Sequence, residues 1–568
     1  MKRTRAVVAA VAAAAGAALA GCTGILGLDA TTLAGGDAST SDATAADAHV
    51  GGDAGSDGTT GATDTGTDAS PADVVTADTS ADGPAPGDGG PPDGPVFTTS
   101  PSVIGLHPDA SLDVTVSVVR NGLAGALAVT FTQLPTGVTS GTGTIAADAG
   151  SAQVTVQAAG NAPAGSAEST IQANGVAVGT VPVDVFGASG ASDTSFGGGI
   201  VIDKTDASGS LFYGVAVDPT SRVVAGGMKQ AGGWMLRRYA NDGTSDTAFA
   251  TATAAWLPTT GSLNALALDP TTGVIVCAGT AGSQLAIAVV DSSGNLSGAF
   301  NSGSLLALTV VQAQSSSGTG VAIEPGARFS VVGGITPANT PYLVAHVPEV
   351  GAPTFAGLPT YDGPAKQSFT AVAVGPDGGI VAAGSDTSAQ PIILVERFQG
   401  ASLDPTFGDG GVGAGSTAFC QGTSVAVRPG SGAVLVGGYD ISTDDGCFSG
   451  WNAMGQRTFQ NPGTGGGGGA FTYWGAVATG DPQDHVYIAG SGGDQFGWGA
   501  ELDRVNVGGA FDTNFGTAGQ VILRDTNSPP AFEYDFRAVA VGADGRIIVA
   551  GSKKDSTGSF PMLARYWP

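Results

Sequence analysis

The chain has 568 residues, and its 94 Gly and 31 Pro leave few long stretches suited to helices. Only 12% of the residues are charged, yet 42% are hydrophobic, so a sizeable core can form. The formal net charge of −27 argues against nucleic acid as a partner, because phosphate groups are bound by a basic surface.

Residues 1–21 have the order of an export signal. Three basic residues within the first five precede an apolar run, Ala6–Ala20, which is too short for a permanent membrane-spanning helix. The run ends Leu19-Ala20-Gly21-Cys22, which resembles the lipobox of bacterial lipoproteins. The resemblance implies recognition of Leu19, Ala20 and Gly21 by a signal peptidase, cleavage before Cys22, and lipid attachment to Cys22. The alternative is an ordinary secretory signal with a chance Cys.

The implied lipid would hold the protein in the bacterial cell envelope, because two or three acyl chains give lasting membrane attachment. Thr23, and not Asp, follows Cys22. By resemblance to enterobacterial sorting, the outer membrane or the cell surface is therefore the expected location, although the choice between inner and outer membrane stays open.

Residues 22–96 are predicted to be a disordered acidic linker. The stretch from Asp29 to Asp93 is mainly Ala, Thr, Gly, Ser, Pro and 13 Asp, with no Glu, Lys or Arg. It has no apolar period, so burial cannot offset the entropy lost on ordering. A calcium-binding tail is the alternative, but the Asp residues lack the spacing of a calcium loop. O-glycosylation stays open.

Residues 97–187 are predicted to form a small immunoglobulin-like β-sandwich. Apolar and polar residues alternate in five short stretches separated by turns such as Asn121-Gly122, namely 112–119, 128–134, 152–157, 169–173 and 181–186. The stretch 134–138, Leu-Pro-Thr-Gly-Val, resembles a turn of bacterial Ig-like modules. That resemblance implies a spacer or stalk, with adhesive binding as the alternative.

The remainder of the chain repeats seven times. Each unit has an apolar strand, a turn rich in Pro, Asp and Gly, and a second apolar strand ending in Gly. The units cover 214–226, 265–279, 320–334, 371–384, 424–438, 476–490 and 538–551. A third strand follows, and in four units an Asp-x-x-Phe motif comes after it, beginning at Asp193, Asp246, Asp404 and Asp512. Four antiparallel strands repeated seven times predict a seven-bladed β-propeller.

The units resemble the delta-60 repeat, whose pattern reads "VAVxPDGxIVVAG", then "ALARY", then "DTTFG". The match covers residues 190–568 and is closest in the units at 371–384 and 538–551. The resemblance implies a propeller, but no established activity.

Ring closure follows from this interpretation. The chain ends in a third strand, 563–567, while 196–202 is a strand without a unit of its own. We expect the early strand to complete the last blade, so that Phe196 and Trp567 belong to one sheet. Arg238, Arg397 and Arg565 recur on third strands, and we expect them to pair with the four motif Asp residues.

A search for catalytic motifs finds none. There is no Gly-x-Ser-x-Gly, no His-Glu-x-x-His and no P-loop, and His346 and His485 occupy different repeat positions. We expect no metal site and no cofactor. The run 465–469 reads as a loop and 443–446 as a solvated turn.

The cysteines beyond Cys22 divide into two kinds. Cys277 lies in an apolar strand and is expected to be buried. Cys420 precedes the first strand of the fifth blade, and Cys447 ends the loop before its third strand. Because these connections emerge on one face and an exported chain is oxidised, a Cys420–Cys447 disulfide is predicted.

The loops before the first strands gather aromatic residues. The candidates for ligand binding at the channel mouth are Tyr213, Tyr361, Tyr473, Trp474, Phe532 and Tyr534. Phe212, Phe369 and Phe536 lie in the same stretches. The alternative is that these rings pack between the blades.

The sequence thus favours a monomeric, envelope-anchored binding or scaffold lipoprotein, whose ligand would be an envelope glycan or protein. The rival is a propeller enzyme, a lyase or a glycoside-active hydrolase. It would need carboxylates that converge at the channel mouth, and the candidates are Asp206, Asp362, Asp525, Glu533 and Asp535.

Overall fold

The structure is a computed structural model that describes residues 94–308, 315–336, 340–351, 361–362, 367–400, 402–413, 415, 419–443, 445–461, 471–480, 484–494, 497–506, 508–525 and 532–568. Within these ranges strands dominate and the single α-helix is α2 (Thr247–Ala254), so the all-β prediction is confirmed. The predicted signal peptide, Cys22 and the linker up to residue 93 lie outside the described residues. No helix in the described part is long and apolar enough to cross a membrane.

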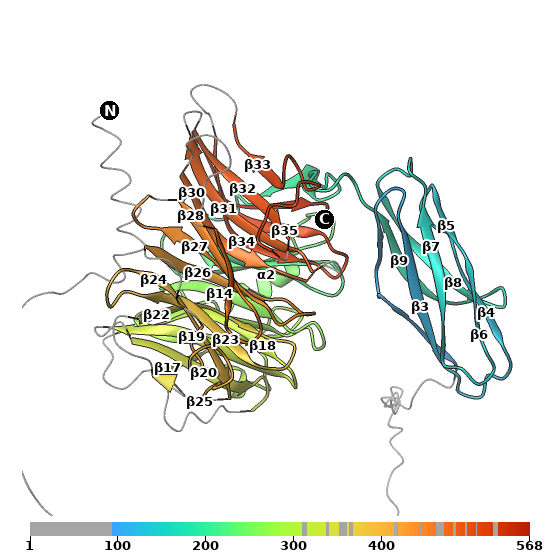
Figure 1. Cartoon of the computed structure of the whole chain (residues 1–568), viewed down its shortest axis with the longest axis horizontal. Helices are drawn as coiled ribbons and strands as arrows, with labels where there is room; N and C mark the ends of the chain where they lie inside the picture. Colours follow the sequence, from blue (N-terminus) through green and yellow to red (C-terminus); the bar gives the residue numbers. More distant parts are fainter. Residues whose placement is uncertain are drawn as a thin grey trace, which may run out of the picture. The chain divides into compact units, whose positions relative to one another are not determined.

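Strands β1 to β9 form two facing sheets around one core (Figure 1, blue to teal). The first sheet has the order β1 (Val96–Ser100), β3 (Ser111–Val119), β7 (Ser151–Ala158), β5 (Val138–Ser140). The second has the order β2 (Ile104–Leu106), β9 (Val176–Val185), β8 (Gly165–Ala173), β4 (Leu127–Thr132), β6 (Thr142–Ile145).

Alternation along these strands decides which side chains enter the core. Val114 and Val116 of β3 pack with Val129 and Phe131 of β4, while the residues between them face outward. Residues 96–185 therefore form two β-sheets that pack face to face around one core.

The described residues from 200 onward form seven further antiparallel sheets, numbered here 1 to 7 in chain order. Sheet 1 consists of β11 (Leu211–Val217), β12 (Val223–Met228) and β13 (Trp234–Tyr239). Sheet 2 consists of β14 (Ser262–Leu268), β15 (Ile275–Ala281), β16 (Gln284–Val290) and β17 (Leu306–Leu308). Sheet 3 consists of β18 (Ser315–Glu324), β19 (Arg328–Thr336), β20 (Thr340–Pro348) and β21 (Tyr361–Asp362).

Sheets 4 to 7 repeat this pattern. Sheet 4 consists of β22 (Gln367–Val374), β23 (Ile380–Asp386), β24 (Ile392–Gln399) and β25 (Ser402–Leu403), and sheet 5 of β26 (Cys420–Val427), β27 (Val434–Asp440), β28 (Gly446–Trp451) and β29 (Arg457–Asn461). Sheet 6 consists of β30 (Phe471–Ala478), β31 (Val486–Asp494), β32 (Gly497–Val505) and β33 (Gln520–Leu523). Sheet 7 consists of β34 (Glu533–Val541), β35 (Ile547–Asp555), β36 (Gly558–Tyr566) and β10 (Ile200–Ile202).

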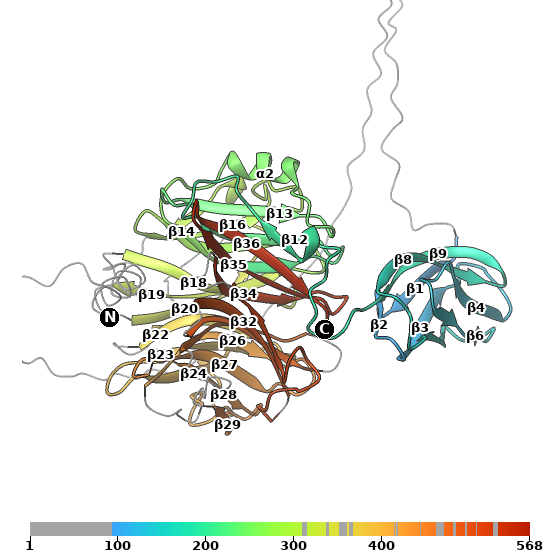
Figure 2. The same cartoon turned by 90° about the horizontal axis from the view of Figure 1, so that it is seen from above.

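The first strands of successive sheets contact one another in a closed circuit. β11 contacts β14, and the series continues through β18, β22, β26 and β30 to β34, which contacts β11. Figure 2 shows the red strands of sheet 7 beside the teal strands of sheet 1. The first strands therefore lie innermost, and the third and fourth strands lie farther out.

The predicted pairing of the two ends is confirmed, but the early strand is shorter than expected. β10 pairs with β36, with Ile200 opposite Ala564 and Ile202 opposite Met562. Gly197–Gly199 form a 3-10 turn with positive φ at all three residues, which ends the extended backbone. Phe196 and Trp567 therefore flank this sheet instead of lying in it, which corrects that detail.

Arginines on the third strands pair with the motif Asp residues, as expected. The pairs are Arg238–Asp246 at 2.7 Å, Arg397–Asp404 at 3.2 Å, Arg504–Asp512 at 2.8 Å and Arg565–Asp193 at 2.7 Å. Arg504 was not predicted.

Three of these arginines also reach the next sheet. Arg238 donates to the carbonyl of Ser292, Arg397 to that of Ala453, and Arg565 to that of Asn241. Each acceptor lies in the turn after the third strand of the following sheet, so one guanidinium ties two sheets together.

Sheet 5 uses a different arginine for the same purpose. Gly450 stands opposite Leu435, at the position where the third strands of sheets 1, 4, 6 and 7 carry Arg. Arg428, in the turn after the first strand, is 1% exposed and donates to the carbonyls of Asp484 and Asn506 of sheet 6. In sheet 5 the guanidinium therefore follows the first strand instead of lying on the third, but it still joins its sheet to the next one.

Candidate functional site

Every first strand of sheets 1 to 7 contains one β-bulge at the same level. At each bulge the register with the second strand shifts by one residue, which leaves that residue outside the ladder. In order, the bulged residues are Tyr213, Asn264, Thr319, Thr370, Thr423, Gly475 and Arg537. They form one level of comparable positions around the circuit.

In sheets 2 to 4 the bulged residue is a small hydrogen-bond donor that joins its sheet to the next. Asn264 donates to the carbonyl of Gly318 at 2.8 Å, and Thr319 donates to that of Phe369 at 2.8 Å. Thr370 donates to the carbonyl of Gly422 at 2.9 Å. Each acceptor precedes the next bulge, so these residues have a structural role.

Sheets 6, 7 and 1 break this pattern. Gly475 has no side chain, and the Arg537 guanidinium lies 5.6 Å from the centre of the Tyr213 ring. Arg537 Nε donates to Asp535 Oδ2 at 2.5 Å, and Ser491 Oγ of sheet 6 donates to Asp535 Oδ1 at 2.6 Å. We call Tyr213, Ser491, Asp535 and Arg537 the 6–7–1 cluster.

The 6–7–1 cluster combines charge with partial exposure. The Arg537 side chain is 35% exposed and that of Asp535 is 24% exposed. Burial, opposed by Arg537 and assisted by Asp535, raises the pKa of Tyr213 above its ordinary value, so the phenol stays protonated and can donate. The cluster therefore offers a phenol, a guanidinium edge and a carboxylate within one sector.

A second group of aromatic residues, Phe532 and Tyr534, lies around the beginning of β34, a few residues before Arg537. The Lys553 ammonium is 3.9 Å from the centre of the Phe532 ring and 5.5 Å from that of Tyr534. Burial and the charge of Asp525 raise the pKa of Tyr534. Both rings are half-buried, and a cation of the chain itself covers part of their faces.

The aromatic prediction thus divides. Tyr213, Phe532 and Tyr534 lie half-buried at the start of the first strands of sheets 1 and 7, whereas the side chains of Tyr361, Tyr473 and Trp474 lie outside the described residues. Phe212, Phe369 and Phe536 are at most 1% exposed and pack edge-on against Tyr239, Phe398 and Tyr566. These three residues directly precede the bulged residues Tyr213, Thr370 and Arg537, and their side chains lie in the core between neighbouring sheets.

The described carboxylates among those that the rival enzyme would need are each held by a partner. Asp206 pairs with Arg237 at 2.6 Å, and Glu533 pairs with Lys554 at 3.0 Å. Asp525 Oδ2 accepts from the Phe532 backbone N–H at 3.0 Å, and Asp535 belongs to the 6–7–1 cluster. The Asp362 side chain lies outside the described residues.

No group of three or more His, Cys, Asp and Glu suited to a metal ion occurs in the described ranges. His485 Nε2 lies 3.5 Å from Asp512 Oδ2, and the His346 side chain is not among those described. Neither histidine is placed beside the candidate carboxylates.

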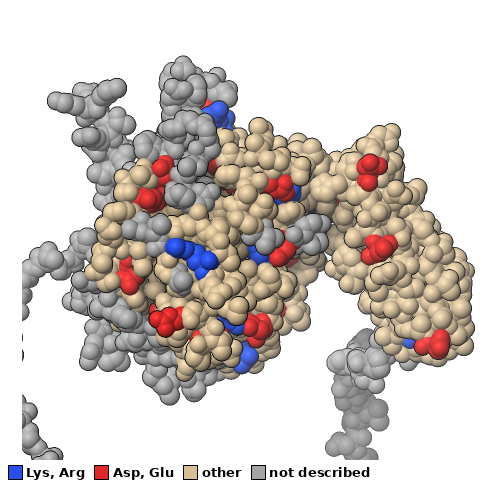
Figure 3. Space-filling model, in the orientation of Figure 1, with Lys and Arg blue, Asp and Glu red and all other residues tan. Residues whose placement is uncertain are grey.

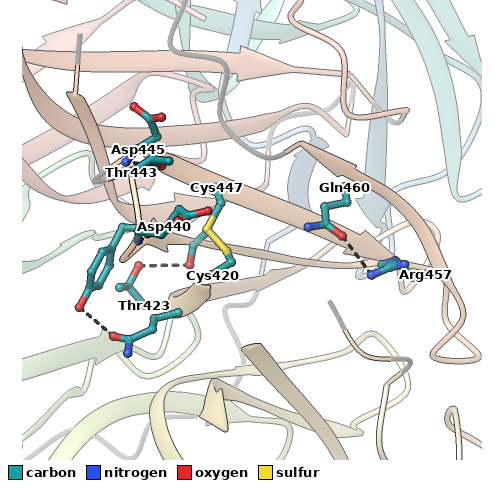
Figure 4. Close-up of a disulfide and its surroundings, with 12 residues drawn as sticks. Cys420, Thr423, Asp440, Thr443, Asp445, Cys447, Arg457 and Gln460 are labelled. Atoms are coloured by element: carbon teal, nitrogen blue, oxygen red, sulfur yellow. Dashed lines mark hydrogen bonds between the residues drawn. A yellow bond between two sulfur atoms is a disulfide. The ribbon is translucent and has the colours of Figure 1, made fainter. Parts of the chain in front are cut away.

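The structure joins Cys420 and Cys447 in a disulfide (Figure 4). Their Cα atoms are 6.3 Å apart, and both residues are 1% exposed. The bond links β26 to β28 across β27, so both cysteines lie within strands, whereas loop positions were expected. Cys277 is fully buried, and burial raises the pKa of its thiol.

A cavity of about 300 Å³ lies between sheets 1 and 2 on the turn side, with Asp218, Arg222 and Arg238 in its wall. Arg222 and Asp218 form an ion pair at 2.6 Å, and Arg238 ties the two sheets together. These residues serve the junction, so the 6–7–1 cluster remains the stronger candidate.

Charged residues are sparse on the described surface. On the face in Figure 3, Lys, Arg, Asp and Glu form separate spots on a mainly uncharged surface. This face shows no continuous basic region of the kind that nucleic acid requires.

No family model and no curated protein matches the chain. Among solved structures, a similar chain is described as a quinoprotein alcohol dehydrogenase-like protein from Bacteroides thetaiotaomicron. It is 10% identical, the match covers 63% of this chain and 93% of that one, and the TM-score is 0.23.

Two structures of Salmonella alpha-2-macroglobulin, a mutant and a methylamine-reacted form, are also similar. They are 11% and 10% identical, and each match covers 83% of this chain and 23% of the other, with a TM-score of 0.15. Overlap at these TM-scores supports no argument about activity.

Proposed function

We propose that this protein is a lipid-anchored binding lipoprotein of the bacterial cell envelope. In this proposal Cys22 carries the lipid, residues 22–96 are the tether, and residues 97–187 are an Ig-like spacer. Residues 190–568 form a seven-bladed β-propeller of delta-60-like repeats that presents the ligand site. The seven comparable sheets, their closed circuit and the pairing of β10 with β36 support the propeller.

The observation that carries the binding function is the break in the level of bulged residues. Three of these residues hydrogen-bond to the next sheet, whereas Tyr213 and Arg537 carry large functional groups beside Asp535. A repeat that departs from a structural rule is a place where a ligand can be recognised. A phenol beside a guanidinium–carboxylate pair suits the hydroxyl groups of a glycan or the backbone of a peptide.

The pairing of the described carboxylates favours binding over hydrolysis. Glycoside hydrolysis needs one acid and one base or nucleophile that face each other with room for substrate. Here each described candidate is engaged by a cation, a hydroxyl or an N–H. The binding proposal is therefore the one we retain.

The test is a glycan array and an envelope pull-down with the mature chain and two variants. We expect Tyr213→Ala combined with Arg537→Gln to weaken binding about tenfold or more, since both functional groups are lost. Thr370→Ala, at the same bulge level in sheet 4, is the matched control and should bind like the wild type. Equal binding by the double variant would reject this site.

Anchoring is tested separately. Cys22→Ser should move the protein from the membrane fraction to the soluble fraction, because no acyl chain can be attached. A variant that stays with the membranes would show that the lipid assignment is wrong.

A further inference from the structure

The junction between sheets 2 and 3 lacks the bridging arginine that the junctions 1–2, 4–5, 5–6 and 7–1 contain. The third-strand position occupied by Arg238, Arg397 and Arg565 is Val289 in sheet 2, where it stands opposite Val276. Val289 is 1% exposed and packs in the core. Sheet 5, which also lacks this arginine, compensates with Arg428, whereas the corresponding turn of sheet 2 contributes Asp269.

The acceptor side of this junction has also changed. In sheets 1, 2 and 5 the arginine is accepted by the carbonyls of Asn241, Ser292 and Ala453. Each of these residues lies two positions after the third-strand partner of the second-strand residue that is four positions before the glycine beside the bulge. These second-strand residues are Val223, Ile275 and Val434, and Phe329 is their equivalent in sheet 3. In sheet 3 the same register position is Glu349. The junction therefore places one carboxylate on each side, where other junctions place a guanidinium and a carbonyl.

The two carboxylates meet at one hydroxyl. Thr272 Oγ1 lies 2.9 Å from Asp269 Oδ2 and 3.4 Å from Glu349 Oε2. Because a hydroxyl has a single proton, it cannot donate to both acids. Asp269 is 5% exposed and Glu349 is 2% exposed, and Glu349 Oε1 is buried without a hydrogen-bond partner.

Asp269 Oδ1 also accepts from the Thr271 backbone N–H at 2.7 Å, whereas among the described residues the Glu349 carboxylate has only the shared Thr272 hydroxyl as a hydrogen-bond partner. Burying an ionised carboxylate is costly unless a cation or hydrogen-bond donors balance it. Four equivalent junctions show what the place accommodates, since each holds an arginine guanidinium between two sheets: 1–2, 4–5, 5–6 and 7–1.

We propose that a calcium ion takes the place of the missing arginine and joins sheets 2 and 3. Its protein ligands would be the carboxylates of Asp269 and Glu349 and the hydroxyl of Thr272, with water completing the shell. All these ligands are oxygens, which suits a hard cation, and their irregular placement suits Ca²⁺ better than Mg²⁺. With two carboxylates, we expect a Kd on the order of 10⁻⁴ to 10⁻³ M, as in extracellular modules.

The experiment compares thermal unfolding of the full chain in EDTA and in 5 mM CaCl2. We expect calcium to raise the Tm of the wild type by about 2 °C, because the ion binds only the folded site. Weak binding to the acidic residues before the sandwich should not shift the Tm if they bind calcium equally in the folded and unfolded chain. Glu349→Gln keeps the size of the side chain and should abolish the calcium shift, as should Asp269→Asn.

Two further variants make the result decisive. Asp218→Asn removes the aligned acid of sheet 1, which already pairs with Arg222, and should keep the full calcium shift. Glu349→Lys supplies a positive charge and should raise the Tm in EDTA while removing the calcium shift. A wild type without a calcium shift, or a Glu349→Gln variant that shifts like the wild type, would overturn the proposal.

Discussion

Single arginines carry much of the contact between neighbouring sheets, and their partners differ in burial. The Arg565 and Asp193 side chains are 2% and 1% exposed, whereas Asp246, the partner of Arg238, is 26% exposed. Removing a fully buried partner leaves a charge that water cannot reach. Equivalent positions in the repeat therefore differ in what they contribute to stability.

We expect Arg565→Met to lower the free energy of unfolding by roughly 1.5 to 3 kcal/mol, because the buried Asp193 would lose its 2.7 Å partner and keep only Arg546, at 3.5 Å, as a cation. Arg238→Met should cost clearly less, since water can hydrate Asp246. Chemical denaturation of both variants checks this. Equal losses would show that burial of the Asp partner does not determine the cost.

The sequence identified three of the four paired arginines, and the reason for the miss is local. Arg238, Arg397 and Arg565 are each followed by an aromatic residue, so the motif is easy to align. Val505 follows Arg504, which hides the equivalence until the register is known. Glu349 could not be recognised either, because its equivalence to Asn241, Ser292 and Ala453 appears only once the register of the strands in sheet 3 is known.

At the scale of strands, the repeats specify the hairpins but not the bulges. The Pro, Asp and Gly turns predicted all seven pairs of first and second strands, because turn chemistry is local. A bulge is a shift of register between strands, which one strand alone does not reveal. A small polar residue or Gly stands at the bulge position in the other five units, and this signal would have singled out Tyr213 and Arg537.

The disulfide of sheet 5 is an element-scale feature with a direct test. Its cysteines are 27 residues apart, and a loop of this size gives about 3 kcal/mol of stabilisation. We expect Cys420→Ser with Cys447→Ser to lose about this amount. In a Cys22→Ser background, unfolding without reduction should expose a single thiol to alkylation, that of Cys277. Three labelled thiols would contradict the disulfide.

At the scale of the whole molecule, the circuit of sheets depends on a strand of three residues. Ile200 and Ile202 of β10 pack on the core shared by sheets 6 and 7, and Val201 packs on the core of sheets 7 and 1. β10 therefore belongs to two cores at once, although it makes a short ladder with β36.

Replacing Ile200, Val201 and Ile202 by Ser should accordingly destabilise sheets 7 and 1 together. We expect faster hydrogen exchange in β11 and β34 and a lower Tm, because the circuit loses its closing strand. The same change in β17, which is also three residues long and an outer strand, should act only on sheets 2 and 3. Similar exchange in both variants would argue against closure by β10.

The position of β10 also sets the order of events during synthesis. A ribosome makes β10 before the other strands of sheets 1 to 7, yet its partner β36 is made after all the others. Until β36 has been synthesised, β10 has no edge to join, and the apolar side chains of sheet 1 that face sheet 7 have no cover. A chain truncated before residue 558 would thus be able to form most of its sheets, but without β36 it could not pair β10 with sheet 7 and close the circuit.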